Sequence, residues 1–283
     1  MPRSAWTDDP ATLLKVMSGF VLADVDPSST PGFEGDKDDG EALLTDAGPE
    51  IADLQERLYA ESREGGLRKV LLVLQAMDTA GKGGVIRHVV GAIDPQGVKV
   101  HGFKKPTPEE LEHDFLWRIR KQLPPAGVVG VFDRSHYEDV LIARVRGLAP
   151  AEELERRYDA IVAFENELVA DDTTVIKVML HLSAAEQKER LAERLDRADK
   201  HWKYNPGDLD ERALWPEYQR AYQLALERTA TEAAPWYVVP ADRKWYARIA
   251  VQRLLLDALR RLDPQWPAAD FDVEAEKKRL AQS

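Results

Sequence analysis

Five short apolar runs, separated by segments with helical periodicity, constrain the fold of this chain more than any other feature. The first run, residues 70–74, is too short for a free-standing helix and leads directly into a glycine-rich stretch. A run that is apolar at every position is typical of a strand buried on both faces of a sheet. Similar runs lie at 98–103, 128–132, 175–180 and 236–239. Strands that alternate with helices predict an α/β fold, in which a five-stranded parallel sheet is flanked by helices on both faces.

The order of these segments also predicts how the chain is organised. Residues 25–40 are rich in Pro, Gly, Asp and Ser, which favours an irregular N-terminal extension over 1–48. An amphipathic helix follows Pro49, and the strand-and-helix pattern ends near residue 263. We therefore expect one domain over 49–263 with a helical lid at about 183–208, and a C-terminal tail over 264–283. In a parallel sheet, ligands bind at the carboxyl ends of the strands, so functional residues should lie there.

Composition excludes several classes of site and location. The chain has no cysteine, which rules out disulfides, thiolate metal sites and a cysteine nucleophile, and predicts a reducing, cytoplasmic location. A net charge of -11 argues against a broad nucleic-acid surface, which needs many basic contacts to phosphate. No apolar run approaches the roughly 20 residues of a membrane span, and we expect neither a signal peptide nor a membrane helix.

The stretch 75–84, QAMDTAGKGG, follows the first predicted strand and opens an apolar helical segment. Strand, glycine-rich loop and helix are the context of a phosphate-binding loop, whose backbone N–H groups surround a phosphate while a lysine reaches the transferred group. Here the lysine is Lys82, and Gly83 stands where the Mg²⁺-binding Ser or Thr is usual. Asp78 is then the available oxygen ligand for the metal. The predicted loop residues are Met77, Thr79, Ala80, Gly81, Gly83 and Gly84. The alternative is a turn that contains Gly and Lys by chance.

A second acidic position lies at the end of the third predicted strand. Asp133 follows this buried run, as the Mg²⁺-binding aspartate does in P-loop kinases. The adjacent Arg134 can pair with phosphate oxygens and offset developing charge. The alternative for Asp133 is a helix N-cap or a surface ion pair. We assign His136 no catalytic role, because transfer to an anionic phosphate oxygen needs no general base.

Basic residues gather after the fourth predicted strand. Ser183 and Glu186 have the spacing of a capping box that opens a helix. Along this helix Arg190, Arg194 and Arg197 share one face. The glutamates and aspartates between them also fit an ordinary solvated face. The position after the fourth strand favours a lid that closes over a phosphate donor.

Four segments together resemble the polyphosphate kinase 2 family, and their sequences are similar to those of its class III branch. They are AMDTAGKGG, VFDRSHYEDVL, RLDRADKHWKYNP and TATEAAPWYVVPADRKWYARI. The resemblance implies a thymidylate-kinase-like P-loop fold, a homo-oligomer (dimer or tetramer), and Mg²⁺-dependent transfer of phosphate between inorganic polyphosphate and AMP, ADP or ATP. It places the family's catalytic residues on Asp78, Lys82, Asp133 and Arg134, with Asp78 and Asp133 as metal ligands. Its lid bases fall on Arg190, Arg194, Lys200 and Lys203, and its pattern adds Lys37 as a ligand contact.

A polyanionic donor needs a cationic track to the loop. Candidates beyond the lid are Arg87, Lys104 and Lys105, and the acidic chain must then concentrate its basic residues at the site. Phe103, Asp114 and Trp117 are nearby candidates for contacts with the base. Two alternatives stay open from the residues alone. One is an ATP-dependent nucleoside monophosphate kinase, and the other is a nucleotide- or polyphosphate-binding protein without turnover.

Overall fold

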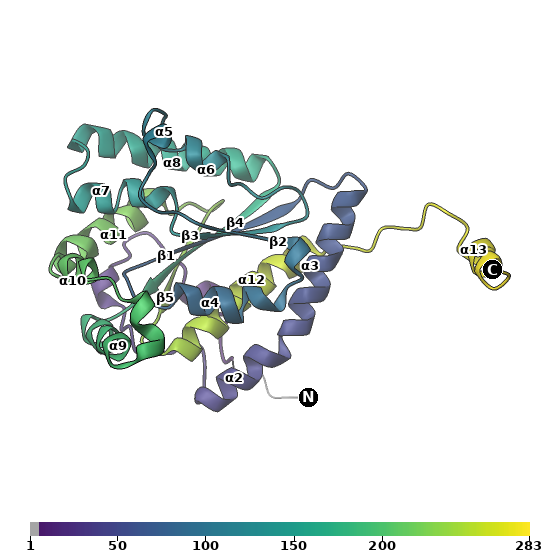
Figure 1. Cartoon of the computed structure of the whole chain (residues 1–283), viewed down its shortest axis with the longest axis horizontal. Coiled ribbons are helices and arrows are strands. Elements are labelled where there is room, and N and C mark those ends of the chain that lie inside the picture. The colour runs from purple at the N-terminus through teal and green to yellow at the C-terminus, as the bar shows by residue number, and fades with distance from the viewer. Residues whose placement is uncertain (1–5) are drawn as a thin grey trace.

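A computed structural model describes residues 6–283, so the first five residues of the expected N-terminal extension lie outside the described chain. Its centre is a five-stranded parallel sheet, as the apolar runs predicted, and the structure gives the strand order β2-β3-β1-β4-β5 (Figure 1). The strands are β1 Lys69–Ala76, β2 Val98–Gly102, β3 Val129–Asp133, β4 Thr173–His181 and β5 Trp236–Pro240.

Helices cover both faces of this sheet, in agreement with the predicted fold class (Figure 1). One face packs against α2 Lys37–Asp46, α3 Gly48–Arg63, α4 Lys82–His88 and α12 Lys244–Leu262. The other packs mainly against α8 Ala151–Ala170 and α11 Trp215–Thr229. The remaining helices are α1 Pro10–Leu13, α5 Pro108–Leu111, α6 Trp117–Arg120, α7 Ile142–Val145, α9 Ala184–Asp196, α10 Gly207–Arg212 and α13 Val273–Leu280, with short 3₁₀ turns at Leu22–Asp24, Val90–Ala92, Pro95–Gly97, His136–Asp139 and Ala198–Lys203.

Strand β1 shows why a continuous apolar run becomes a central strand. Successive side chains of a strand point to opposite faces. Accordingly, Leu72 and Leu74 pack in the core on the α12 side, whereas Leu71 and Val73 pack in the core on the α8 side. Strand β2 differs because it lies at the edge of the sheet, and Val100 stays 47% exposed.

The N-terminal segment is more ordered than its composition suggested. Helix α2 begins at Lys37, within the stretch predicted to be irregular, because Asp36 and Asp39 form a capping box at its start. A Cβ added at Gly40 would lie 2.5 Å from the ring of Trp245, so this glycine lets α2 pack closely on α12. Helix α13, by contrast, lies away from the body (Figure 1) and all its residues are exposed. In the part of the chain that the structure covers, no helix has the length and apolar character needed to cross a membrane.

Candidate active site

The glycine-rich stretch forms the predicted strand–loop–helix unit. Strand β1 ends at Ala76 and α4 begins at Lys82, with Gly81 as its N-cap. Gly81 has a φ of 113°, a conformation that favours glycine, and its carbonyl accepts hydrogen bonds from the amides of Gly84 and Val85 at 2.8 and 3.1 Å. The loop therefore turns sharply at the carboxyl edge of the sheet.

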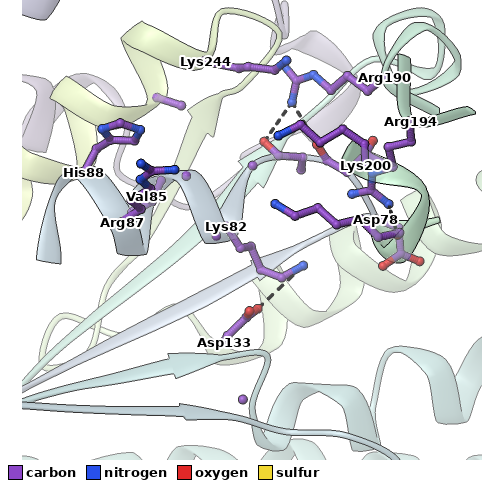
Figure 2. Close-up of a pocket in the computed structure, with 18 of the residues that line it drawn as sticks. Asp78, Lys82, Val85, Arg87, His88, Asp133, Arg190, Arg194, Lys200 and Lys244 are labelled. Atoms are coloured by element: carbon purple, nitrogen blue, oxygen red, sulfur yellow. Dashed lines mark hydrogen bonds and ion pairs between the residues drawn. The ribbon is translucent and has the colours of Figure 1, made fainter. Parts of the chain in front are cut away.

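Asp133 reaches the same edge because β3 runs parallel to β1, with Leu74 and Asp133 in register. Lys82 Nζ lies 4.0 Å from Asp133 Oδ1, and Figure 2 shows the two side chains pointing toward each other. Across the loop, Arg134 Nη2 donates to Asp78 Oδ1 at 2.8 Å. Asp78, Lys82, Asp133 and Arg134 thus line one cavity of about 680 Å³, within the usual range of ligand pockets.

Arg134 stands in an uncommon backbone conformation. Its φ is 63°, in the left-handed region, which costs a residue with a Cβ roughly 1–2 kcal/mol. Its amide donates to the carbonyl of Leu74 at 3.0 Å. Burial by itself lowers the pKa of Arg134, but the charges of Glu138 and Asp78 outweigh it and raise this pKa above its ordinary value. The side chain therefore stays a cation at any accessible pH.

Helix α9, where the lid was predicted to begin, starts after Ser183 as expected but forms only half of the predicted capping box. Ser183 Oγ accepts from the Glu186 amide at 3.0 Å, which is half of a capping box. The Glu186 carboxylate does not accept from the Ser183 amide, as a full capping box requires, because it pairs with Arg190 Nε at 2.7 Å. Arg194, one turn further on, donates to the carbonyl of Lys203 at 3.0 Å and so links α9 to the following 3₁₀ turn.

Arg190 lines the cavity, but its guanidinium is already occupied. Nη1 donates to the carbonyls of Thr79 and Ala80 at 3.0 and 3.1 Å. Nη2 donates to the carbonyls of Ala241 and Asp242 at 2.7 and 2.9 Å. With 5% of the side chain exposed, Arg190 holds the loop against the segment that follows β5. The role of a phosphate-binding lid base, which the resemblance implied, does not fit these contacts.

Most of the other predicted site residues also line the cavity. They are Thr79, Ala80, Gly81, Gly83, Gly84, Arg87, Lys104, Arg194, Lys200 and Lys203, together with Phe103.

Five of the predicted positions do not line it. Met77 is 6% exposed and packs in the core on the α8 side. Lys37 points to solvent and pairs with Glu41. Lys105 is not among the lining residues. Asp114 pairs with Arg156, and Trp117 stacks on His113 with ring centroids 3.9 Å apart. A chain position close to a strand end therefore does not by itself bring a side chain into the cavity.

Three basic residues at the cavity were missed by motif reasoning. Lys244 and Arg248 come from α12, and His88 from the last turn of α4 (Lys244 and His88 are labelled in Figure 2). Burial lowers the pKa of His88, and the charges of Arg248 and Arg87 lower it further. The one available signal was the segment containing RKWYARI, which carries Lys244 and Arg248 but has no spacing that marks a site.

The lining of the cavity is strongly basic although the chain is acidic. Eleven Lys and Arg residues line it against three Asp and Glu, while the whole chain carries a net charge of -11. This confirms the expected segregation of charge. Such a cavity attracts a polyanion.

The acidic side chains of the cavity fit a magnesium ion that also binds the phosphates of a substrate. Asp78 and Asp133 offer two carboxylates to the cavity. No group of three or more His, Cys, Asp or Glu residues suited to a metal occurs within residues 6–283. Mg²⁺ commonly binds through one or two carboxylates and completes its shell with water and substrate phosphates.

Comparisons with known proteins give the relatives of the chain as a whole. The sequence model of the family "Polyphosphate kinase 2 (PPK2)" matches residues 34–267. The AMP/ADP-polyphosphate phosphotransferase of Meiothermus ruber is 46% identical over 255 residues, which are 90% of this chain and 94% of that protein. The ADP-polyphosphate phosphotransferase of Rhodopseudomonas palustris is 40% identical over 268 residues, 90% of each chain. The crystal structure of polyphosphate kinase 2 from Arthrobacter aurescens TC1 superposes with a TM-score of 0.97, at 61% identity over 98% of both chains.

Proposed function

The chain belongs to the polyphosphate kinase 2 family, and from this premise we propose that it transfers phosphoryl groups from inorganic polyphosphate to AMP and ADP with the help of Mg²⁺. It is an enzyme that moves phosphate between polyphosphate and a nucleotide. Beyond this, we propose that both AMP and ADP are acceptors, that the reaction is reversible in principle and that the metal is Mg²⁺. The Meiothermus ruber relative is named for AMP and ADP, which supports both acceptors here.

One observation carries the proposal. Asp78, Lys82, Asp133 and Arg134 come from two neighbouring strand ends and line one cationic cavity. A protein catalyses phosphoryl transfer mainly by positioning the two reactants and by stabilising negative charge. These four residues supply two cations and two carboxylates to one cavity.

Each residue has a role that follows from its chemistry. Lys82 and Arg134 bind oxygens of the transferred group, and both keep these oxygens from repelling the acceptor phosphate. Asp78 and Asp133 would hold Mg²⁺, and a bound Mg²⁺ would offset negative charge on the phosphate groups. The bond between the terminal phosphorus of the donor and its bridging oxygen breaks as an oxygen of the acceptor phosphate forms a new P–O bond in line with it, and the shortened polyphosphate leaves with the bridging oxygen. No proton transfer is needed, because that acceptor oxygen is already anionic.

The rest of the basic lining serves the long donor. Arg194, Lys200 and Lys203 from the lid, with Lys244 and Arg248 from α12, extend the positive charge beyond the loop. A polyphosphate chain carries about one negative charge on each phosphate, so it needs a track of cations and not a single site. We also propose a homo-oligomer, a dimer or tetramer, as the family resemblance implied.

The donor is tested by a reaction without ATP. The purified protein is incubated with AMP, Mg²⁺ and long-chain polyphosphate, and the nucleotides are separated by chromatography. We expect ADP first and then ATP. A parallel reaction contains AMP and ATP without polyphosphate. ADP in this second reaction alone would show an ATP-dependent nucleoside monophosphate kinase and refute the proposed donor.

A matched pair of variants tests the site. Asp78→Asn removes one charge at the cavity and should lower the transfer rate by about 10²–10³-fold, the range typical of lost charge stabilisation. Asp171→Asn removes the same charge from a side chain that is 72% exposed and pairs with Lys69 at the start of β1, at the other edge of the sheet. Its rate should stay within about twofold of the unaltered protein. Equal losses in both variants would show that overall charge, and not the site, sets the rate.

A further inference from the structure

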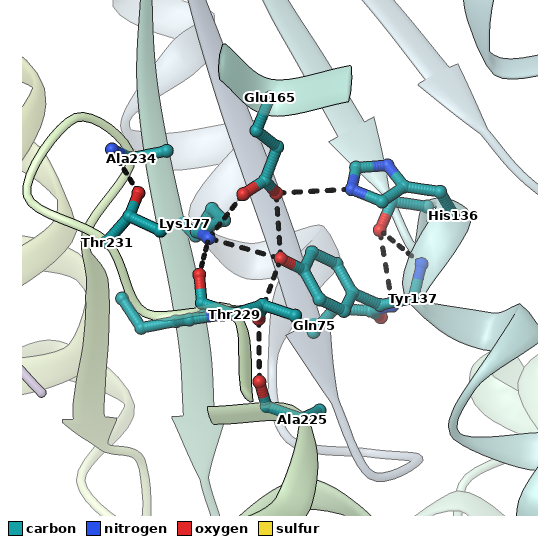
Figure 3. Close-up of polar contacts among 11 residues, drawn as sticks. Gln75, His136, Tyr137, Glu165, Lys177, Ala225, Thr229, Thr231 and Ala234 are labelled. Carbon is teal, nitrogen blue, oxygen red and sulfur yellow. Dashed lines mark hydrogen bonds and ion pairs between the residues drawn. The ribbon is translucent and has the colours of Figure 1, made fainter. Parts of the chain in front are cut away.

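A lysine and a glutamate are buried together beneath the candidate active site. Lys177 lies in the middle of strand β4, between apolar residues, and its side chain is 0% exposed. Its Nζ donates to Glu165 Oε2 of α8 at 2.6 Å and to the carbonyl of Thr229 of α11 at 2.7 Å. Figure 3 shows this pair at the centre of a set of polar contacts. An ion pair in this position is unusual, because both faces of a parallel sheet are normally apolar.

The same glutamate holds two consecutive residues of the segment that follows β3. Tyr137 donates its hydroxyl hydrogen to Glu165 Oε1 at 2.7 Å and accepts from Lys177 Nζ at 3.1 Å. His136 Nε2 lies 3.3 Å from the same Oε1 (Figure 3). Burial alone raises the pKa of Glu165, but the charge of Lys177 and the contact with His136 bring it below its ordinary value. The carboxylate is therefore ionised and can accept from all three partners.

This segment is the one that presents Arg134 to the cavity. Ser135 Oγ accepts from the Tyr137 amide at 3.2 Å and from Gln75 Nε2 of β1 at 3.3 Å. Arg134 itself is held in the left-handed conformation, with its guanidinium at Asp78. The contacts at Glu165 thus hold the two residues that follow Arg134 by two and three positions.

Stability does not explain why the pair is there. A buried ion pair loses the hydration of both charges, and apolar residues of similar volume are often at least as stabilising in its place. Buried polar networks do specify one arrangement of the groups that they join. Here the joined groups are a central strand, two helices and the turn after Arg134.

We propose that Glu165, Lys177, Tyr137 and His136 form a positioning unit, named here the anchor network, that holds Arg134 in place for phosphoryl transfer. None of the four lines the cavity, so they act through Arg134 and not on the substrate. The proposal rests on the proposed function for the reaction that Arg134 serves. The restraint of the segment after β3 does not depend on the proposed function, because it is inferred from the hydrogen bonds alone.

The first test removes a single hydroxyl. Tyr137→Phe keeps the ring, the Glu165–Lys177 pair and the His136–Glu165 contact, but it removes the hydroxyl through which Tyr137 binds the pair. We expect kcat to fall about tenfold with each KM within about twofold, because a misplaced catalytic group affects the transition state more than binding. The control is Tyr246→Phe, which removes another buried hydroxyl, bonded to the Pro31 carbonyl at 2.8 Å, from α12. Unchanged kcat in Tyr137→Phe, or an equal fall in the control, would overturn the proposal.

A double-mutant cycle tests whether the effect passes through Arg134. In an Arg134→Ala background, Tyr137→Phe should change kcat by less than about twofold, because the group being positioned is already gone. A further tenfold loss in that background would show that the anchor network acts independently of Arg134, contrary to the proposal.

Amide hydrogen exchange gives a readout that needs no activity. Exchange over residues 133–139 should become at least about fivefold faster in Tyr137→Phe. A second variant, Glu165→Leu with Lys177→Met, replaces the pair by apolar residues of similar volume and should show the same local effect. Unchanged exchange in both would overturn the proposal even if the protein transfers phosphate normally. Failure to use polyphosphate, with faster exchange in both variants, would instead refute the proposed function and leave the anchor network supported.

Discussion

Arg190→Ala should destabilise the folded protein much more than an ordinary lid substitution would. The guanidinium donates to four backbone carbonyls, two in the phosphate loop and two after β5, and the bonds to Ala80 and Ala241 are fully buried. A hydrogen bond from a charged donor contributes about 1.5–3 kcal/mol. Counting only the two buried bonds, since water can replace the others, the expected loss in the free energy of unfolding is about 3–6 kcal/mol.

The assay is urea unfolding followed by tryptophan fluorescence, with Arg194→Ala as the matched control. Arg194 lies one turn along the same helix, is 24% exposed and pairs with Asp208 at 3.3 Å. Its loss should cost clearly less than that of Arg190, because water reaches this part-buried ion pair. Arg190→Lys should recover less than half of the loss, because one ammonium cannot serve carbonyls on both segments. If Arg190→Ala is as stable as the unaltered protein and loses only activity, this arginine acts on the substrate and the structural role is wrong.

Three further predictions follow from the site and the core. Asp133→Asn should lower the transfer rate about 10²–10³-fold. Chelation of Mg²⁺ by EDTA should lower the rate of the unaltered enzyme by a similar factor. When Mg²⁺ is restored in the rate assay, only the chelated enzyme should recover. Lys177→Met alone leaves Glu165 buried without its partner and should cost about 3–5 kcal/mol in urea unfolding, whereas Glu165→Leu with Lys177→Met leaves no buried charge and should cost clearly less than Lys177→Met alone. Burial holds the pKa of His181 below its ordinary value, with Asp242 offsetting part of the shift. Below about pH 6.5 the unfolded chain binds the proton more readily, so stability should fall as pH drops from there toward the folded-state pKa. His181→Gln should flatten this fall between pH 7 and 5, and an unchanged slope of the unfolding free energy would contradict the assignment.

The parts of the site that lie next to a strand end could be predicted because their information is local. The run 70–74 predicts β1, and the glycines after it require a turn, so Lys82 has to stand at the start of α4. Asp133 follows from the same logic applied to β3. Parallel strands share one carboxyl edge, which brings the two ends together without any knowledge of the packing.

Side chains that reach the cavity from distant elements could not be predicted in this way. Lys244 and Arg248 lie on an amphipathic helix more than 160 residues after the loop, and nothing in its periodicity marks them. The apolar run that predicts β4 likewise contains Lys177, and no local pattern shows that its partner is Glu165.

The sequence by itself therefore determined the fold class, the phosphate loop and the two carboxylates, because each is encoded in residues that are adjacent in the chain. Only the tertiary structure decided which basic side chains stay free for a substrate. Arg190 and Arg194 lie one turn apart on the same helix, yet the packing places backbone carbonyls around the first and leaves the second partly exposed at the cavity. A guanidinium surrounded by carbonyl acceptors forms its hydrogen bonds within the protein, and where those acceptors lie depends on segments far away in the chain.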